Sequence, residues 1–175
     1  MAGTWTGWHS VGGMLDAGDV PVPVVPGSYA FRIRPDLGVV PSGCPIRLID
    51  IGGMGSTGSL YGRVCTFIGA GLGRYQMSGA GPPHSAGLNF SHYRSRTQNA
   101  WTITVRDLDV AFVIAPVGHE HYCGEVSTWH WYSTVFAPAA GTTATYPWCC
   151  SSAKKRCSHP GGPAAHAWYR PPPAP

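Results

Sequence analysis

The sequence predicts a small α/β (α+β) domain, with a central, mostly antiparallel sheet flanked by helices. Short runs rich in β-branched and aromatic residues alternate with Pro- and Gly-marked turns, and one later run has helical spacing. Charged residues make up only 11% of the 175 residues, and 24 Gly and 17 Pro are present. This composition is typical of one loop-rich domain with its own core rather than of a helical bundle.

Two strands joined by a loop open the predicted sheet. Residues 28–33 place apolar side chains on one face of a strand and arginine on the other, with Tyr29 on the apolar face. A second strand is predicted over residues 46–51. It contains Asp50, and an unpaired buried carboxylate is costly. We therefore expect Asp50 to be either a turn or cap residue before Gly52 or a group that positions water or a metal ion.

A helix is predicted from about Ser59 to about Leu72. Its apolar residues recur at helical spacing, a Ser or Thr within 56–59 can cap its start, and glycines follow its last turn. The glycine-rich run over 52–59 lacks the Gly-Lys-Ser/Thr ending of a P-loop, so we interpret it as a linker. Arg63 lies inside the helix, on the side expected to face the two strands.

The second half of the chain is predicted to add two strands and a helix. Residues 101–105 alternate in polarity, and residues 109–114 form a nearly continuous apolar run that is typical of a buried central strand. An amphipathic helix is expected over 126–136, directly after Glu125.

The order of a tyrosine-bearing strand, a second strand and an arginine-bearing helix resembles the GIY-YIG nuclease family. Gly27-Ser28-Tyr29 corresponds to the first motif, Asp50-Ile51-Gly52 to the second, and Arg63 to the essential arginine of the helix. The segment that begins at His84 is similar to a His-Ser-Gly-Gly segment of some of these nucleases. Glu125 stands where the family has its metal-binding glutamate. The resemblance extends over roughly residues 27–150.

Two positions depart from the family pattern. Asp50 stands where the family usually has a tyrosine, and Trp148 follows Pro147 where the family has an asparagine. These departures favour an alternative from another class, a non-catalytic nucleic-acid-binding module.

The resemblance implies metal-dependent hydrolysis of DNA phosphodiester bonds, by an endonuclease of restriction or toxin type. Tyr29 would activate or hold the attacking water, and Arg63 would stabilise charge on the phosphate. Glu125, with Glu120 as the second choice, would hold one Mg²⁺ or Mn²⁺, and His84 would donate or relay a proton. Asp50 completes the set of catalytic candidates. One such site cuts one strand, so double-strand cleavage would require a homodimer or two successive events.

The charge pattern is consistent with DNA as the partner. The formal net charge is +4, and ten of the twelve basic residues are arginines, which bind phosphate in a bidentate manner. We expect an N-terminal extension over 1–26, the nuclease-like domain over 27–150, and a basic and then Pro/Gly/Ala-rich tail over 151–175. The predicted nucleic-acid contacts are basic residues, several of them interleaved with aromatic ones: Arg74, His92, Arg94, Arg96, Lys154 and Lys155.

A zinc-stabilised interaction domain is the third possibility. Six cysteines are present, but their spacing with the histidines matches no standard zinc pair and forms no even disulfide framework. No apolar stretch approaches the length of a membrane span, and the N-terminus lacks the pattern of a secretory signal. We therefore expect a cytoplasmic protein without membrane contact.

Overall fold

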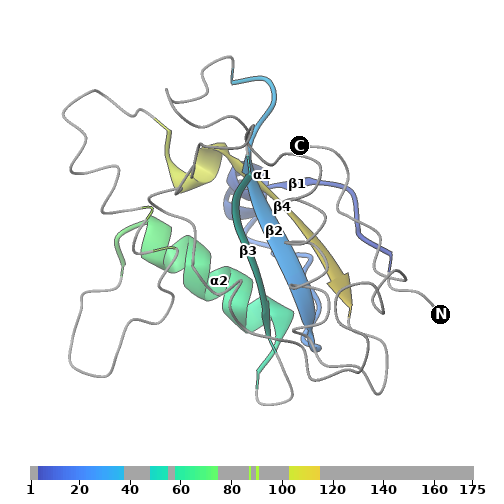
Figure 1. The fold of residues 1–175 in the computed structure, drawn as a ribbon. Coiled ribbons are helices and arrows are strands. Elements are labelled where there is room, and N and C mark those ends of the chain that lie inside the picture. Colours follow the sequence, from blue (N-terminus) through green and yellow to red (C-terminus); the bar gives the residue numbers. More distant parts are fainter. Residues whose placement is uncertain are drawn as a thin grey trace, which may run out of the picture.

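The computed structural model describes residues 4–37, 48–54, 58–74, 87, 90 and 103–114 (Figure 1). Within these residues lie a four-stranded sheet, two α-helices and one 3-10 helix. This mixed α+β architecture with a small antiparallel sheet confirms the predicted fold class. The elements, in chain order, are β1 (His9–Ser10), α1 (Val11–Ala17), β2 (Gly27–Ile33), β3 (Leu48–Met54), α2 (Leu60–Gly71), η1 (Val105–Asp107) and β4 (Leu108–Ile114).

The sheet has the strand order β1-β4-β2-β3, and all its neighbouring strands are antiparallel. Strand β2 lies between β4 and β3 and pairs with β4 along its whole length, from Gly27 opposite Ile114 to Ile33 opposite Leu108. Strand β4 is buried from its first residue to its sixth, as the continuous apolar run over 109–114 predicted for a central strand. Tyr29, at the middle of β2, therefore lies inside the sheet.

One hydrophobic core joins both helices to one face of the sheet. Cross-strand partners share a face, so the face that carries Tyr29 and Phe31 also carries Val110 and Phe112 of β4. The rings of Phe31 and Phe67 stack with their centroids 3.9 Å apart, which fixes α2 against β2. The same core contains buried side chains from α1, α2, η1 and the residues between them: Val11, Met14, Val22, Leu60, Val64, Phe67, Ile68 and Val105.

The predicted helix over 59–72 is confirmed, with Ser59 as its N-cap. The Ser59 side chain accepts a hydrogen bond from the Gly62 amide at 3.1 Å, and the Arg63 amide donates to the Ser59 carbonyl. The two preceding amides donate to carbonyls ahead of β2: Leu60 to Val25 and Tyr61 to Pro23. All four N-terminal amides of α2 are thus engaged within the protein.

The structure corrects two strand predictions. The second strand, described from Leu48 to Met54, continues past its predicted end at 51, so it extends through the two glycines that the sequence suggested as a linker. Residues 46 and 47 of the predicted strand lie outside the described residues. The strand predicted over 101–105 is wrong for its described part, because Val105–Asp107 form a 3-10 helix. Thr104 caps it, with Asp107 accepting hydrogen bonds from the Thr104 amide and hydroxyl. The helix predicted over 126–136 lies outside the described residues.

The N-terminal segment belongs to the same sheet and core. Residues 1–26 were predicted as an extension, and their described part supplies β1, which pairs with β4, and α1. Ser10 caps α1 by accepting a hydrogen bond from the Gly13 amide at 3.2 Å, and Gly18 ends the helix in the left-handed conformation. Trp5 is buried at 7% exposure, so it packs on the domain as expected for a structural tryptophan.

Candidate functional site

Tyr29 is the centre of the candidate site. Its side chain is 1% exposed, and its hydroxyl donates a hydrogen bond to Oδ2 of Asp50 at 3.2 Å. The Phe31 ring contacts the Tyr29 ring edge-on, with centroids 5.5 Å apart. A buried phenol with a carboxylate partner is held in one orientation, because both the ring and the hydroxyl proton are fixed.

Gly52 makes room for this tyrosine. It lies directly opposite Tyr29 in the pairing of β2 with β3. A Cβ atom at Gly52 would come within 2.2 Å of the Tyr29 hydroxyl oxygen, so any larger residue would displace the ring. An aromatic residue that covers a cross-strand glycine is a known device of β-sheets. The sequence reasoning missed this role of Gly52, and a predicted strand register would have revealed it.

Asp50 reaches Tyr29 because regular strand pairing places both side chains on one face. Asp50 lies opposite Phe31, two residues from Gly52, which lies opposite Tyr29. The register shifts only after this pair, where Arg32 lies opposite Leu48. Asp50 is 2% exposed. The expectation that it is a turn or cap residue is therefore wrong, because it is a buried strand residue bonded to the tyrosine.

Helix α2 carries Arg63 along the same face. Leu60 packs over Gly27, where a Cβ atom would come within 2.5 Å of the Leu60 Cδ1, and Phe67 stacks on Phe31. Helix and strand therefore run in the same direction over comparable lengths, roughly 10 Å along α2 and roughly 13 Å along β2. Arg63 follows Leu60 by three residues, and Tyr29 follows Gly27 by two. Arg63 and Tyr29 therefore lie at similar positions along the parallel axes of α2 and β2. The Arg63 side chain is half-buried, and its Nε atom is buried.

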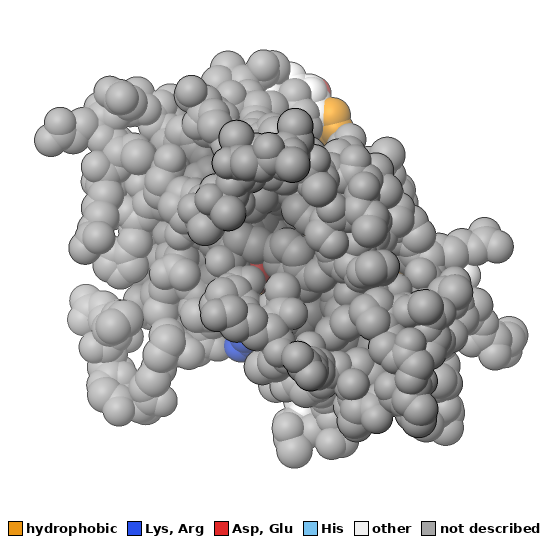
Figure 2. Space-filling view, in the orientation of Figure 1, with side chains coloured by type: hydrophobic (Ala, Val, Ile, Leu, Met, Phe, Trp, Pro, Cys, Tyr) orange, Lys and Arg blue, Asp and Glu red, His pale blue; other side chains and the backbone are white. Residues whose placement is uncertain are grey.

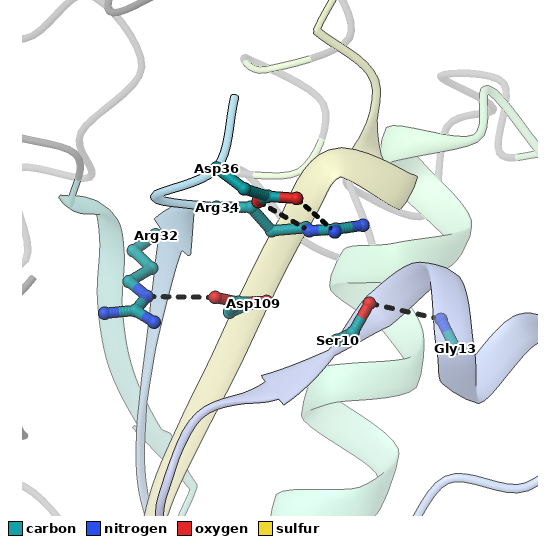
Figure 3. A network of polar contacts seen from close by, with 6 residues as sticks. All are labelled: Ser10, Gly13, Arg32, Arg34, Asp36 and Asp109. Carbon is teal, nitrogen blue, oxygen red and sulfur yellow. Dashed lines mark hydrogen bonds and ion pairs between the residues drawn. The ribbon is translucent and has the colours of Figure 1, made fainter. Parts of the chain in front are cut away.

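The opposite face of the sheet carries an ion pair. Arg32 of β2 lies opposite Asp109 of β4, and its Nε donates to the Asp109 carboxylate at 3.0 Å (Figure 3). The two side chains are 11% and 10% exposed. The Arg32 guanidinium also lies 4.3 Å from the ring centroid of Trp8. Arg32 is therefore engaged on both sides by the protein itself.

Cys65 is the one cysteine among the described residues, and it lies half-buried on α2. Burial raises the pKa of its thiol, while a hydrogen bond with Tyr61 acts in the opposite direction. A raised pKa keeps the thiol protonated at neutral pH. Cys65 thus lacks the property that activates a cysteine nucleophile.

Two of the predicted site residues, Tyr29 and Asp50, are brought into contact on one face, and α2, which packs on that face, carries Arg63. Arg74 is exposed just beyond the end of α2, where its amide donates to the Gly69 carbonyl. On the surface shown in Figure 2, the described Lys and Arg side chains form no extended basic area. The other predicted residues lie outside the described part of the chain: His84, Glu125, His92, Arg94, Arg96, Lys154 and Lys155.

The described residues do not by themselves build a metal centre. No group of three His, Cys, Asp or Glu side chains with metal-binding geometry occurs among them. Of the described residues, Asp50 alone contributes a carboxylate to the candidate site, and the predicted ligand Glu125 lies outside the described ranges. The cysteines and histidines considered for zinc lie outside them as well: His119, His121, Cys123, Cys149, Cys150, Cys157 and His159.

Neither α1 nor α2, the α-helices of the described segments, has the length and apolar character that a bilayer span requires.

Comparison of the chain with protein-family models, with curated proteins and with solved structures finds no match. The geometry around Tyr29 and the motif order in the sequence are therefore the features of this chain that bear on its function.

Proposed function

We propose that this chain is a divergent GIY-YIG-type endonuclease that hydrolyses DNA phosphodiester bonds in the presence of Mg²⁺ or Mn²⁺. The observation that supports the proposal is the arrangement of Tyr29, Asp50 and Arg63. The tyrosine hydroxyl is fixed by a carboxylate at 3.2 Å, and the helix that packs on the same face carries the arginine at a similar level. The first tyrosine motif, the second strand and the helix occur in the order of that family.

Arg63 is the group proposed to stabilise charge on the phosphate. Helix N-termini often bind phosphate through their free amides. In α2, however, the first four amides donate to Val25, Pro23 and Ser59. A guanidinium offers several donors in a fixed plane, and fixed donors directed at developing charge lower a reaction barrier by several kcal/mol.

Tyr29 is the group proposed to contact the attacking water. Its hydroxyl donates its proton to Asp50, and a phenol oxygen is also a hydrogen-bond acceptor. His84 is proposed to protonate the leaving oxygen, and Arg74 and the other predicted basic residues are proposed to contact the DNA backbone. A divalent ion bound by Glu125 would supply Lewis-acid assistance to the leaving oxygen.

Cleavage of supercoiled plasmid tests this proposal. We expect nicking or linearisation with Mg²⁺ or Mn²⁺ and none with EDTA. Arg63→Ala should slow cleavage about 100- to 1,000-fold, the range found when one charge-stabilising donor is removed. Arg106→Ala is the matched control, because Arg106 is exposed and pairs with Asp16 away from the site. Equal rates for Arg63→Ala and the wild type would overturn the assignment of Arg63. Loss of cleavage in Glu125→Ala would identify the ion's ligand.

A non-catalytic nucleic-acid-binding module is the second candidate, and one observation favours it. Tyr29 is 1% exposed and bonded within the core, as a purely structural tyrosine would be. If this candidate holds, the protein shifts a DNA band on a gel but cleaves no plasmid with either ion. A stoichiometric, tightly held zinc ion in the purified protein would instead favour the zinc-stabilised interaction domain.

A further inference from the structure

We propose that Asp50 is a positioning residue for Tyr29. Asp50 holds the proton of the Tyr29 hydroxyl by a hydrogen bond, and it accepts that proton when Tyr29 takes one from the attacking water. This inference rests on the proposed nuclease function. Its basis is the contact between the Tyr29 hydroxyl and Oδ2 of Asp50, both buried on the face that α2 covers.

The need for such a partner follows from the chemistry of a phenol. A phenol keeps its proton at neutral pH, and a neutral hydroxyl that accepts a second proton becomes a high-energy cation. Tyr29 can therefore act as a base only if its own proton leaves as the new one arrives. Asp50 is within hydrogen-bonding distance of that proton.

In the proposed step, one proton of the attacking water moves to the Tyr29 oxygen, and the original Tyr29 proton moves to Oδ2 of Asp50. The water oxygen forms a bond to phosphorus, the bond from phosphorus to the leaving oxygen breaks, and the leaving oxygen takes a proton from His84 or from solvent. Tyr29 ends neutral, and Asp50 ends as a neutral carboxylic acid that returns its proton to solvent.

The structure holds the pair in the geometry that this transfer needs. Gly52 leaves the space that the Tyr29 ring fills, because a Cβ atom there would come within 2.2 Å of the hydroxyl oxygen. Phe31 contacts the ring at its edge and also lies opposite Asp50 in the sheet. The regular pairing of Asp50 with Phe31 places Asp50 on the face of Tyr29. Ring, hydroxyl and carboxylate are thus fixed by separate contacts.

Other titratable groups on the elements around Asp50 define its electrostatic surroundings. Among the described residues, α2 carries Arg63, Tyr61 and Cys65, and of these Arg63 is charged at neutral pH. On β2, Tyr29 shares the face of Asp50, whereas Arg32 lies on the other face with Asp109. Arg63 is therefore the charged side chain that α2 carries among these groups.

The pH profile of DNA cleavage by Asp50→Asn tests the inference. Asparagine keeps the size of the side chain but accepts no proton. We expect the rate to fall about 100- to 10,000-fold and its rise with pH through the acid range to disappear. Asp109→Asn is the matched control, because Asp109 is a buried aspartate on the opposite face. It should change stability but leave the shape of the pH profile unchanged.

A second variant keeps the inference testable if Asp50→Asn folds poorly. Tyr29→Phe keeps the ring and removes the proton path, so it should lose the same limb of the pH profile. The double variant should cleave no more slowly than the slower single variant, because the two residues act as one unit.

The outcomes separate this inference from the proposed function. If the wild type cleaves DNA and Asp50→Asn keeps both its rate and its pH profile, the inference is overturned and the nuclease proposal stands. Independent, multiplicative losses in the double variant would also overturn it. If the wild type cleaves no DNA with either ion, both proposals fall together.

Discussion

The two faces of the sheet each bury an aspartate, and the two carboxylates are held in different ways. Asp109, 7% exposed, receives its hydrogen bond from the charged Arg32, which is also stacked on Trp8. Asp50, 2% exposed, receives a hydrogen bond from the neutral hydroxyl of Tyr29. Arginine does not give up its proton at any physiological pH, whereas a phenol can exchange one. The first pair therefore holds strands together, and the second can also take part in proton transfer.

Breaking the ion pair should produce the largest loss of stability. Arg32→Ala leaves the Asp109 carboxylate buried without its cation and removes the contact with Trp8. Loss of one partner of a buried pair destabilises a protein by about 3–5 kcal/mol. We expect a decrease of this size in the free energy of unfolding, measured by urea denaturation. The cleavage rate per folded molecule should stay unchanged.

The control for this change is the double variant Arg32→Leu/Asp109→Leu. Apolar replacement of both partners removes the charge that would be left buried, so much of the lost stability should return. A double variant less stable than Arg32→Ala would mean that the pair stabilises the protein by more than charge compensation. That result would contradict the explanation given for the face that carries Arg32 and Asp109.

Filling the space beneath Tyr29 should have a smaller effect on stability and a specific effect on the site. In Gly52→Ala the new methyl group would lie 2.2 Å from the tyrosine hydroxyl oxygen, so the ring must move away from Asp50. Overpacking of this kind costs about 1–3 kcal/mol. We expect a lower melting temperature together with a loss of cleavage.

Gly13→Ala is the matched control for that variant. Gly13 is exposed in α1, and a Cβ atom there would lie 3.6 Å from its nearest neighbour, the Ser10 Cβ. An alanine in a helix is favoured over glycine by about 0.5–1 kcal/mol, so this variant should melt slightly higher. A Gly52→Ala protein with unchanged melting temperature and cleavage would show that the position of Tyr29 does not depend on the space left at Gly52.

Local patterns in the sequence were sufficient to predict β2, α2 and β4. The alternation around Tyr29, the cap at Ser59 and the continuous apolar run over 109–114 each depend on neighbouring residues. α1 was missed because its seven residues include two glycines and have weak helix propensity; it is stabilised by the burial of Val11 and Met14. For η1, the Thr104–Asp107 capping box was a visible signal that the strand interpretation overlooked.

The candidate site was predictable only as a set of residues. Three contacts depend on strand register: Tyr29 lies over Gly52, Asp50 shares the face of Tyr29, and Arg32 meets Asp109. The strands concerned are separated by long connections, and no local pattern specifies their register. The resemblance to a nuclease family supplied the list of residues, and the pairing of the strands supplied their contacts.

The smallest effect is expected for the exposed ion pair beyond the end of β2. Nε and Nη2 of Arg34 donate to the Asp36 carboxylate at 3.1 and 2.5 Å (Figure 3). Hydrogen bonding to Asp36, together with the negative charge of Asp36, raises the pKa of Arg34. The two side chains are 36% and 60% exposed, so water and salt screen the pair. Arg34→Ala should therefore melt within the scatter of repeated wild-type measurements, and added salt should remove any remaining difference. A loss as large as that of Arg32→Ala would mean that charge pairing stabilises this sheet regardless of burial, and the contrast between its buried and exposed pairs would fail.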